Sequence, residues 1–316
     1  MDSADLRQLA ETTRSRREAG IALLLSSSIL ALFFFIQIHQ EKPAAQPAIT
    51  VATSTAPDAF AHIQIDGKAA IVLDLATGET LYAYNADAQL PLASLTKLLT
   101  VYAAFSELSP TTPITIPVDA THVDAPRAFS AGQVFTLSDL ARLTLTASLN
   151  DGATAIALAT AARENNSPHA MLAGAASALN LAQTYAVNGS GLDVSTSVSG
   201  GYGSARDLAR LAGALVYKAP LVAAATTNAS TEAVAADGKR FIVKNTDPIV
   251  NTIPRLLLSK TGYTDLAGGN LALVFDAGIE HPIAVVVLGS SKNARFTDSS
   301  TLIAATFAHF AGVASL

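Results

Sequence analysis

The order of strand-like and helix-like segments constrains the fold of this chain more than any other feature. Two strand-like runs, residues 69–75 and 79–84, come early and are joined by a turn in which Gly78 can adopt a positive φ. Helical patterns fill the middle of the chain. Three further strand-like runs follow near the end: residues 256–262, 270–276 and 282–289. An isolated hairpin cannot bury its apolar residues, so the early strands must join the late strands in one sheet.

This order predicts an α+β fold. We expect an antiparallel sheet of about five strands, formed from the N- and C-terminal segments and flanked by helices, with an all-helical subdomain. Residues 151–162 are apolar on nearly every side, which is typical of a helix buried in the middle of a domain. Residues 296–310 are expected to form a closing helix.

The N-terminal region predicts a membrane anchor. Residues 20–38 carry no charge and are almost entirely apolar, and about 19 helical residues span roughly 28 Å, close to the thickness of a bilayer's hydrocarbon core. Arg14, Arg16 and Arg17 shortly before this run predict a cytoplasmic N-terminus at residues 1–19 and an extracytoplasmic chain after the anchor. A cleaved signal peptide is the alternative, since residues 44–48 offer small residues for cleavage.

The rest of the chain divides into a linker and a domain. Residues 39–60 are rich in Ala, Pro and Thr and are expected to form a flexible linker, which leaves residues 61–316 as one globular domain. The sequence has no cysteine, and its net charge of −5 argues against nucleic-acid binding. Its six histidines show no metal-ligand spacing, so we expect no metal and no cofactor.

Three short segments carry the chemistry that the sequence predicts. Ser94 and Lys97 are three residues apart at the start of a helix, so they share one face. Serine becomes a nucleophile only when a base takes its proton, and lysine can do so only when burial or a second cation lowers its pKa. On its own, this pair is more typical of a serine and a solvated lysine on an ordinary helix.

The second segment is Ser148-Leu149-Asn150, which precedes the expected buried helix. The Ser148 hydroxyl can relay a proton to a leaving amine. The Asn150 amide can hold a substrate carbonyl, orient the lysine or simply cap the helix.

The third segment, Lys260-Thr261-Gly262, lies on a predicted strand. There the lysine and the threonine hydroxyl can bind a carboxylate, and the glycine leaves room for a ligand backbone to approach.

With these three motifs in this order, the chain resembles the penicillin-recognising serine enzymes, which carry S-x-x-K, S-x-N and K-T-G. Within them it is most similar to the serine-type D-alanyl-D-alanine carboxypeptidases, the low-molecular-weight penicillin-binding proteins. The likeness covers about residues 62–312 and extends to stretches such as Pro91-Leu92-Ala93 and Asn188-Gly189-Ser190-Gly191-Leu192-Asp193. It implies a β-lactamase/DD-peptidase-like catalytic domain over residues 61–316.

The resemblance also implies a role for each matching residue. Ser94 is expected to be the acylated nucleophile, Lys97 its general base and Ser148 a proton relay. Asn150, Lys260, Thr261 and Gly262 are expected to bind the substrate, with the backbone N–H groups of Ser94 and Tyr263 forming the oxyanion hole. The implied partners are peptidoglycan stem peptides ending in D-Ala-D-Ala, and β-lactam antibiotics as covalent inhibitors.

Some points depart from the family or stay open. Leu149 stands where many relatives have a small residue, and we expect it to narrow the cleft. Many relatives also carry a second all-β domain and a C-terminal amphipathic helix. We expect neither here, with the N-terminal anchor providing the attachment. A DD-endopeptidase, a β-lactamase and a catalytically silent cell-wall-binding relative remain the alternative functions.

Overall fold

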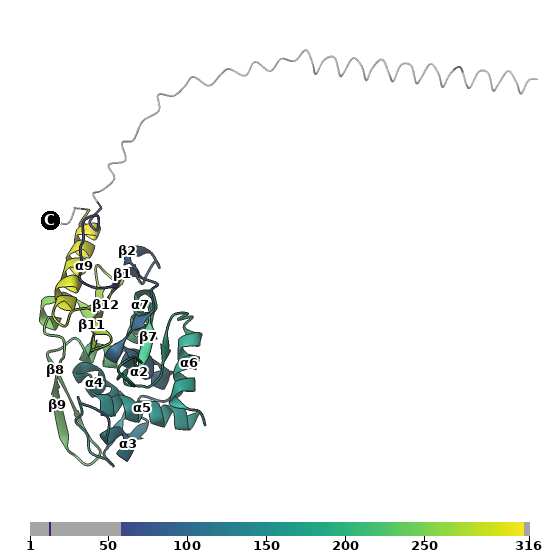
Figure 1. Cartoon of the computed structure of the whole chain (residues 1–316), viewed down its shortest axis with the longest axis vertical. Coiled ribbons are helices and arrows are strands. Elements are labelled where there is room, and N and C mark those ends of the chain that lie inside the picture. Colours follow the sequence, from purple (N-terminus) through teal and green to yellow (C-terminus); the bar gives the residue numbers. More distant parts are fainter. Residues whose placement is uncertain (1–12, 14–57, 313–316) are drawn as a thin grey trace, which may run out of the picture. The chain divides into compact units, whose positions relative to one another are not determined.

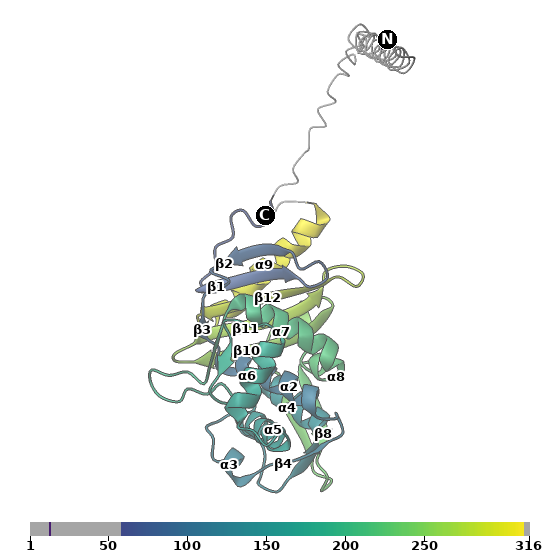
Figure 2. The same ribbon diagram turned by 90° about the vertical axis from the view of Figure 1, so that its right-hand side faces the viewer.

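The computed structural model of the protein describes Thr13 and residues 58–312. Its central element is a five-stranded antiparallel sheet with the strand order β10-β11-β12-β1-β2 (Figure 2). The strands are β1 (Ala69–Asp74), β2 (Thr80–Tyr84), β10 (Leu256–Thr264), β11 (Gly268–Asp276) and β12 (Pro282–Ser290). The early strand β1 pairs with the late strand β12, so the predicted joining of both chain segments is confirmed.

Alternation along β12 explains why both faces of this sheet are covered. Ile283, Val285 and Val287 belong to a cluster with Leu302 and Ile303 of α9 (Ala294–Ala311). The intervening residues point to the opposite face, because successive side chains of a strand alternate. There they pack with α7 (Ala205–Lys218), and Figure 2 shows the sheet between α9 and α7.

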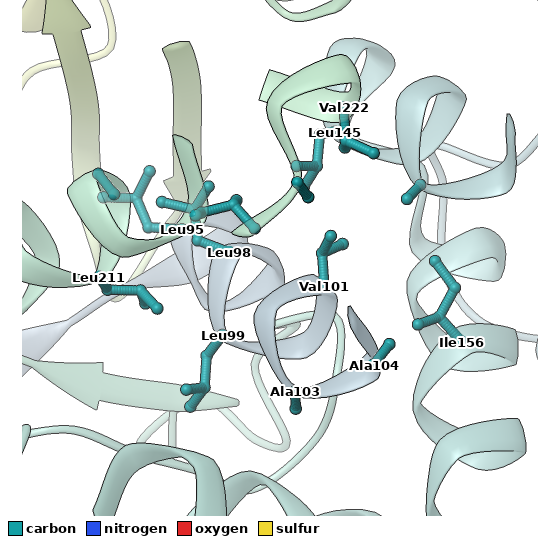
Figure 3. Close-up of a cluster of buried hydrophobic side chains, with 14 of the residues drawn as sticks. Leu95, Leu98, Leu99, Val101, Ala103, Ala104, Leu145, Ile156, Leu211 and Val222 are labelled. Carbon is teal, nitrogen blue, oxygen red and sulfur yellow. The ribbon is translucent and has the colours of Figure 1, made fainter. Parts of the chain in front are cut away.

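Helix α2 (Thr96–Glu107) forms the centre of the helical part of the domain. Its apolar side chains meet those of neighbouring helices on several sides (Figure 3). These neighbours include Leu145 of α4, Ile156 of α5 and Leu211 of α7. A helix surrounded in this way is shielded from water over most of its surface. This shielding disfavours the charged form of Lys97, which the helix carries.

The remaining elements complete the helical part, which lies beside the sheet (Figures 1 and 2). The helices are α3 (Val118–Thr121), α4 (Leu137–Ala147), α5 (Asn150–Arg163), α6 (Pro168–Ala178) and α8 (Pro220–Ala225). Short strands accompany them: β3 (Leu90–Pro91), β4 (Pro113–Thr115), β5 (Val134–Thr136), β6 (Tyr185–Ala186), β7 (Gly201–Gly203), β8 (Ser230–Val234) and β9 (Arg240–Lys244). The subdomain is therefore mainly helical, with small hairpins that the sequence analysis does not predict.

The predicted membrane anchor at residues 20–38 and most of the predicted linker at residues 39–60 lie outside the described residues. Among the helices that the structure describes, none combines the length and the apolar composition needed to cross a bilayer.

Candidate active site

Ser94 lies in a 3₁₀ turn, η1 (Ala93–Leu95), that leads directly into α2. Ala93 has a φ of +48°, a left-handed backbone conformation that residues other than glycine rarely adopt. Such a conformation persists only where the surrounding structure stabilises it. Part of this support comes from the sheet, because the Asn270 amide donates to the carbonyls of Pro91 and Leu92, at 3.0 Å each. The position of the serine is thus fixed by strand β11 as well as by its own helix.

Lys97 is completely buried and makes three short contacts at its Nζ atom. It lies 2.7 Å from Ser94 Oγ, 2.7 Å from Asn150 Oδ1 and 2.7 Å from the carbonyl oxygen of Ser190. Ser94 and Lys97 therefore do share one helix face, as the spacing predicts, and the lysine is not on an ordinary helix surface.

The surroundings of Lys97 favour a neutral amine. Burial lowers the pKa of Lys97 well below its usual value, and the charge of Lys260 lowers it further, while Asp151 acts in the opposite direction. A neutral amine has two N–H groups, which suffice for Asn150 and Ser190. Its lone pair then remains to accept the proton of the Ser94 hydroxyl.

Ser148 and Asn150 occupy the junction between α4 and α5. Ser148 follows the last residue of α4 with a φ of +59°, and its side chain is buried. Asn150 opens α5 but does not cap it, because the N-cap position is Leu149 and no side chain bonds there. The Asn150 amide instead accepts from Lys97 and donates to the carbonyls of Asp124 and Ala125, at 3.0 Å each.

These contacts distinguish the roles that the sequence left open for Asn150. Its oxygen and its amide hydrogens already have protein partners, so its geometry suits holding Lys97 more than holding a substrate carbonyl. Leu149 also differs from expectation. Its side chain is buried in the main hydrophobic cluster, a location that gives no support to a narrowed cleft.

Lys260 approaches the same site from strand β10, which is the edge strand of the sheet. Its Nζ atom donates to Ser148 Oγ at 2.9 Å and to the carbonyl oxygen of Thr261 at 2.6 Å. Burial lowers the pKa of Lys260 to about 7, and the nearby Arg295 contributes to this shift, while Asp247 opposes it. Both lysines therefore bond to the segment Ser148-Leu149-Asn150, Lys97 through Asn150 and Lys260 through Ser148.

Gly262 is needed for a reason that differs from the expected one. A Cβ atom at this position would lie 2.9 Å from the Leu92 carbonyl oxygen and 3.3 Å from the Ser94 nitrogen. The glycine therefore lets β10 pack directly against the turn that holds Ser94. That it also leaves space for a ligand backbone stays a prediction. Tyr263 follows it on the strand, and its side chain is exposed.

The sequence analysis missed several buried polar residues behind β10. Arg295 of α9 donates from Nη1 to the Gly262 carbonyl at 2.5 Å. Asp247 accepts a hydrogen bond from Ser259 Oγ at 2.6 Å and is almost fully buried. A burial pattern cannot reveal isolated charged residues like these, because their partners are distant in sequence. Among the described residues, no cluster of His, Cys, Asp and Glu could hold a metal ion.

Comparison with known proteins decides the family. Residues 51–292 match the model of the D-alanyl-D-alanine carboxypeptidase family, peptidase S11. The chain belongs to this family. It is therefore a serine hydrolase of the DD-peptidase class, the class that acts on peptidoglycan.

Individual relatives agree with this assignment. The chain is 30% identical over 264 residues to a D-alanyl-D-alanine endopeptidase of Pseudomonas aeruginosa, covering 81% of this chain and 82% of that protein. It is 30% identical over 281 residues to the D-alanyl-D-alanine carboxypeptidase DacC of Escherichia coli, of which it spans 66%, with 81% of this chain covered. Penicillin-binding protein D2 of Listeria monocytogenes, solved with cefotaxime bound, superposes with a TM-score of 0.65 at 26% identity, covering 78% and 99% of the two chains.

Proposed function

We propose that this protein is an exported, membrane-anchored serine DD-carboxypeptidase that removes the terminal D-alanine from peptidoglycan stem peptides. The observation that carries the proposal is the contact of 2.7 Å between Ser94 Oγ and the amine of a fully buried lysine, Lys97. Burial favours the neutral amine, and a neutral amine next to a serine hydroxyl is the arrangement that nucleophilic catalysis requires.

In the acylation step, Ser94 Oγ attacks the carbonyl carbon of the penultimate D-alanine while its proton passes to Lys97 Nζ. The negative charge that develops on the carbonyl oxygen is stabilised by the backbone N–H groups of Ser94 and Tyr263. Gly262 permits this geometry by bringing β10 against the turn that holds Ser94.

The tetrahedral intermediate then collapses to an ester. The C–N bond to the terminal D-alanine breaks, and the proton that Lys97 took from Ser94 passes through Ser148 to the leaving amine, so Lys97 is neutral again. Ser148 Oγ already accepts a hydrogen bond from Lys260. Water then attacks the Ser94 ester, with Lys97 again acting as the base, and the shortened stem peptide leaves with a new carboxylate.

The free carboxylate of the substrate is bound by Lys260 and Thr261 on β10. Both side chains are buried, so a charged contact there is weakly screened by water. Asn150 serves mainly to hold the amine of Lys97 in place.

The location of the enzyme follows from the N-terminal sequence. The uncharged run at residues 20–38, preceded by arginines, supports a single-pass anchor with the catalytic domain on the extracytoplasmic side of the membrane. That side is where peptidoglycan stem peptides are found. Fractionation of cells that express the full chain tests this part of the proposal.

Covalent labelling tests the catalytic part. A fluorescent penicillin should attach to the wild-type protein and fail to attach to Ser94→Ala, because the hydroxyl that forms the ester is absent. Structures of the Listeria monocytogenes relative with ampicillin and cefotaxime bound make β-lactams suitable probes. Equal labelling of both proteins would exclude Ser94 as the nucleophile, and rapid loss of the label would favour a β-lactamase.

A DD-endopeptidase is the second candidate, because the Pseudomonas aeruginosa relative bears that name. The two activities use the same acylation chemistry and differ in the leaving amine, which is free D-alanine in one case and a cross-linked peptide in the other. Analysis of the products from linear and cross-linked muropeptides separates them. Release of D-alanine without cleavage of cross-links would support the carboxypeptidase.

A further inference from the structure

We propose that Thr246 is a positioning residue for substrate binding, one that directs the hydroxyl of Thr261 towards the substrate's carboxylate. Thr246 lies in the segment between β9 and the 3₁₀ turn η2 (Val250–Thr252) and belongs to none of the three motifs. Its Oγ1 atom lies 2.6 Å from Thr261 Oγ1, and either hydroxyl can be the donor. Thr261 is buried, whereas Thr246 is exposed, so the pair extends from the site to the surface.

The backbone around Thr246 is anchored on both sides. Asn245 donates from its amide to the carbonyls of Thr226, at 2.7 Å, and Asn228, at 2.9 Å. Asp247 is buried and accepts from Ser259 Oγ on β10. An exposed threonine between two such anchored residues is held in a defined place, because its neighbours have little freedom to move.

Thr246 also connects the two halves of the site. Its backbone N–H donates to the Thr146 carbonyl at 3.1 Å, in the last turn of α4 just before Ser148. Its hydroxyl is 3.5 Å from the same oxygen, which is the limit of a hydrogen bond. Thr246 therefore lies between the helix end that presents Ser148 and the strand that presents Lys260 and Thr261.

These distances predict how the two hydroxyls behave when a carboxylate binds. Thr261 must then donate its proton to a carboxylate oxygen, so its oxygen needs a donor of its own. Thr246 can supply that donor over 2.6 Å by giving up only its weak contact with Thr146. Hydrogen bonds in such a chain strengthen one another, so the removal of Thr246 weakens the bond from Thr261 to the carboxylate.

Two peptide substrates that differ only in their C-terminal carboxylate test the role of Thr246. Because the role rests on the proposed function, labelling of Ser94 by a fluorescent penicillin is measured first, in the wild-type protein. Hydrolysis is then compared for a peptide that ends in D-Ala-D-Ala with a free carboxylate and for the same peptide as a C-terminal methyl ester. The variants are Thr246→Val, Thr246→Ser and Thr252→Val. Thr252 provides the control, since its exposed hydroxyl donates only to the Ile249 carbonyl in the same segment.

We expect Thr246→Val to lose about tenfold in kcat/KM on the free carboxylate, mainly through a higher KM, and less than about twofold on the ester. Thr246→Ser should retain the wild-type values, and Thr252→Val should match the wild type on both substrates. Equal losses of Thr246→Val on both substrates would show a merely structural role and overturn the inference, as would no loss on either. An unlabelled wild-type protein would instead contradict the proposed function itself.

Discussion

Lys97 and Lys260 reach the same site from different parts of the molecule, and the protein surrounds them differently. Lys97 projects from a helix that is packed on several sides, and its Nζ atom contacts the Ser94 hydroxyl and two oxygen acceptors, Asn150 Oδ1 and the Ser190 carbonyl. Lys260 projects from an edge strand of the sheet, and the charges of Arg295 and Asp247 have opposite effects on its pKa. Burial and the charge of Lys260 lower the pKa of Lys97 well below its usual value, which suits a base. Lys260 has a pKa of about 7, so it is protonated below neutral pH, which suits a cation that binds a carboxylate.

Removing each lysine amine should give the largest effects and therefore tests this difference most directly. Lys97→Met should slow acylation of Ser94 about 10³-fold for every substrate, because the general base is lost. Lys260→Met should lower kcat/KM about 100-fold for substrates with a free carboxylate, and much less for carboxylate-free esters, because it removes one charged contact. Rates of penicillin labelling and peptide hydrolysis measure both effects.

The control for these substitutions is Lys218→Met, at the exposed end of α7. It should leave both rates unchanged, and thermal unfolding should show that all three variants fold. The assignment of roles would be wrong if Lys97→Met acylated normally, or if Lys260→Met slowed esters and carboxylates equally.

The pH dependence of kcat/KM sharpens the comparison further. Lys97 must be neutral to act as the base, so activity should rise with pH as it deprotonates, and its lowered pKa moves this rise below the pH at which an ordinary lysine loses its proton. Lys260 must be protonated to attract a carboxylate. Because its pKa is about 7, kcat/KM should fall up to about tenfold per pH unit above that value.

Lys260→Arg provides the contrast, since a guanidinium keeps its proton over the whole range. Its profile for carboxylate substrates should lack the fall above pH 7, even if its activity is lower. A profile that falls at the same pH in both proteins would assign that limb to another group.

The smallest expected effect concerns the contact between strand β10 and the turn that holds Ser94. Gly262→Ala should cost about 1–3 kcal/mol of folding free energy and slow acylation, because its Cβ would press on the backbone beside Ser94. Gly278→Ala is the matched control, as its Cβ would make only an ordinary contact with His281 at 3.7 Å. Denaturant unfolding and labelling rates test both, and equal stability of the two variants would contradict the close packing.

Much of this architecture could be predicted because it depends on repeating patterns. The apolar runs of β1, β10, β11, β12 and α5 and the periodicity of α2 are local signatures, and those predictions are confirmed. The hairpin of β8 and β9 was missed although its signal is present. Its strands have alternating burial and flank Gly238, which has a φ of +85°.

The supporting residues of the site could not be predicted in the same way. Asn270, Asp247 and Arg295 are single polar residues in apolar or irregular surroundings. Their partners Pro91, Ser259 and Gly262 lie on other segments, 179, 12 and 33 residues away. Only the fold brings them together. Motifs therefore identify the groups that react, whereas the groups that orient them emerge from tertiary packing.

The pairing of β1 with β12 has a consequence for how the protein matures. Ala69 pairs with Leu288, so the sheet closes only after nearly the whole catalytic domain has been synthesised. Such distant contacts slow folding, because a long loop must close before any contact stabilises it. Likewise, Ser94 lies against Gly262 only once β10 has formed. A nascent or truncated chain therefore lacks the complete active site, and we expect hydrolytic activity only after the last strands have joined the sheet.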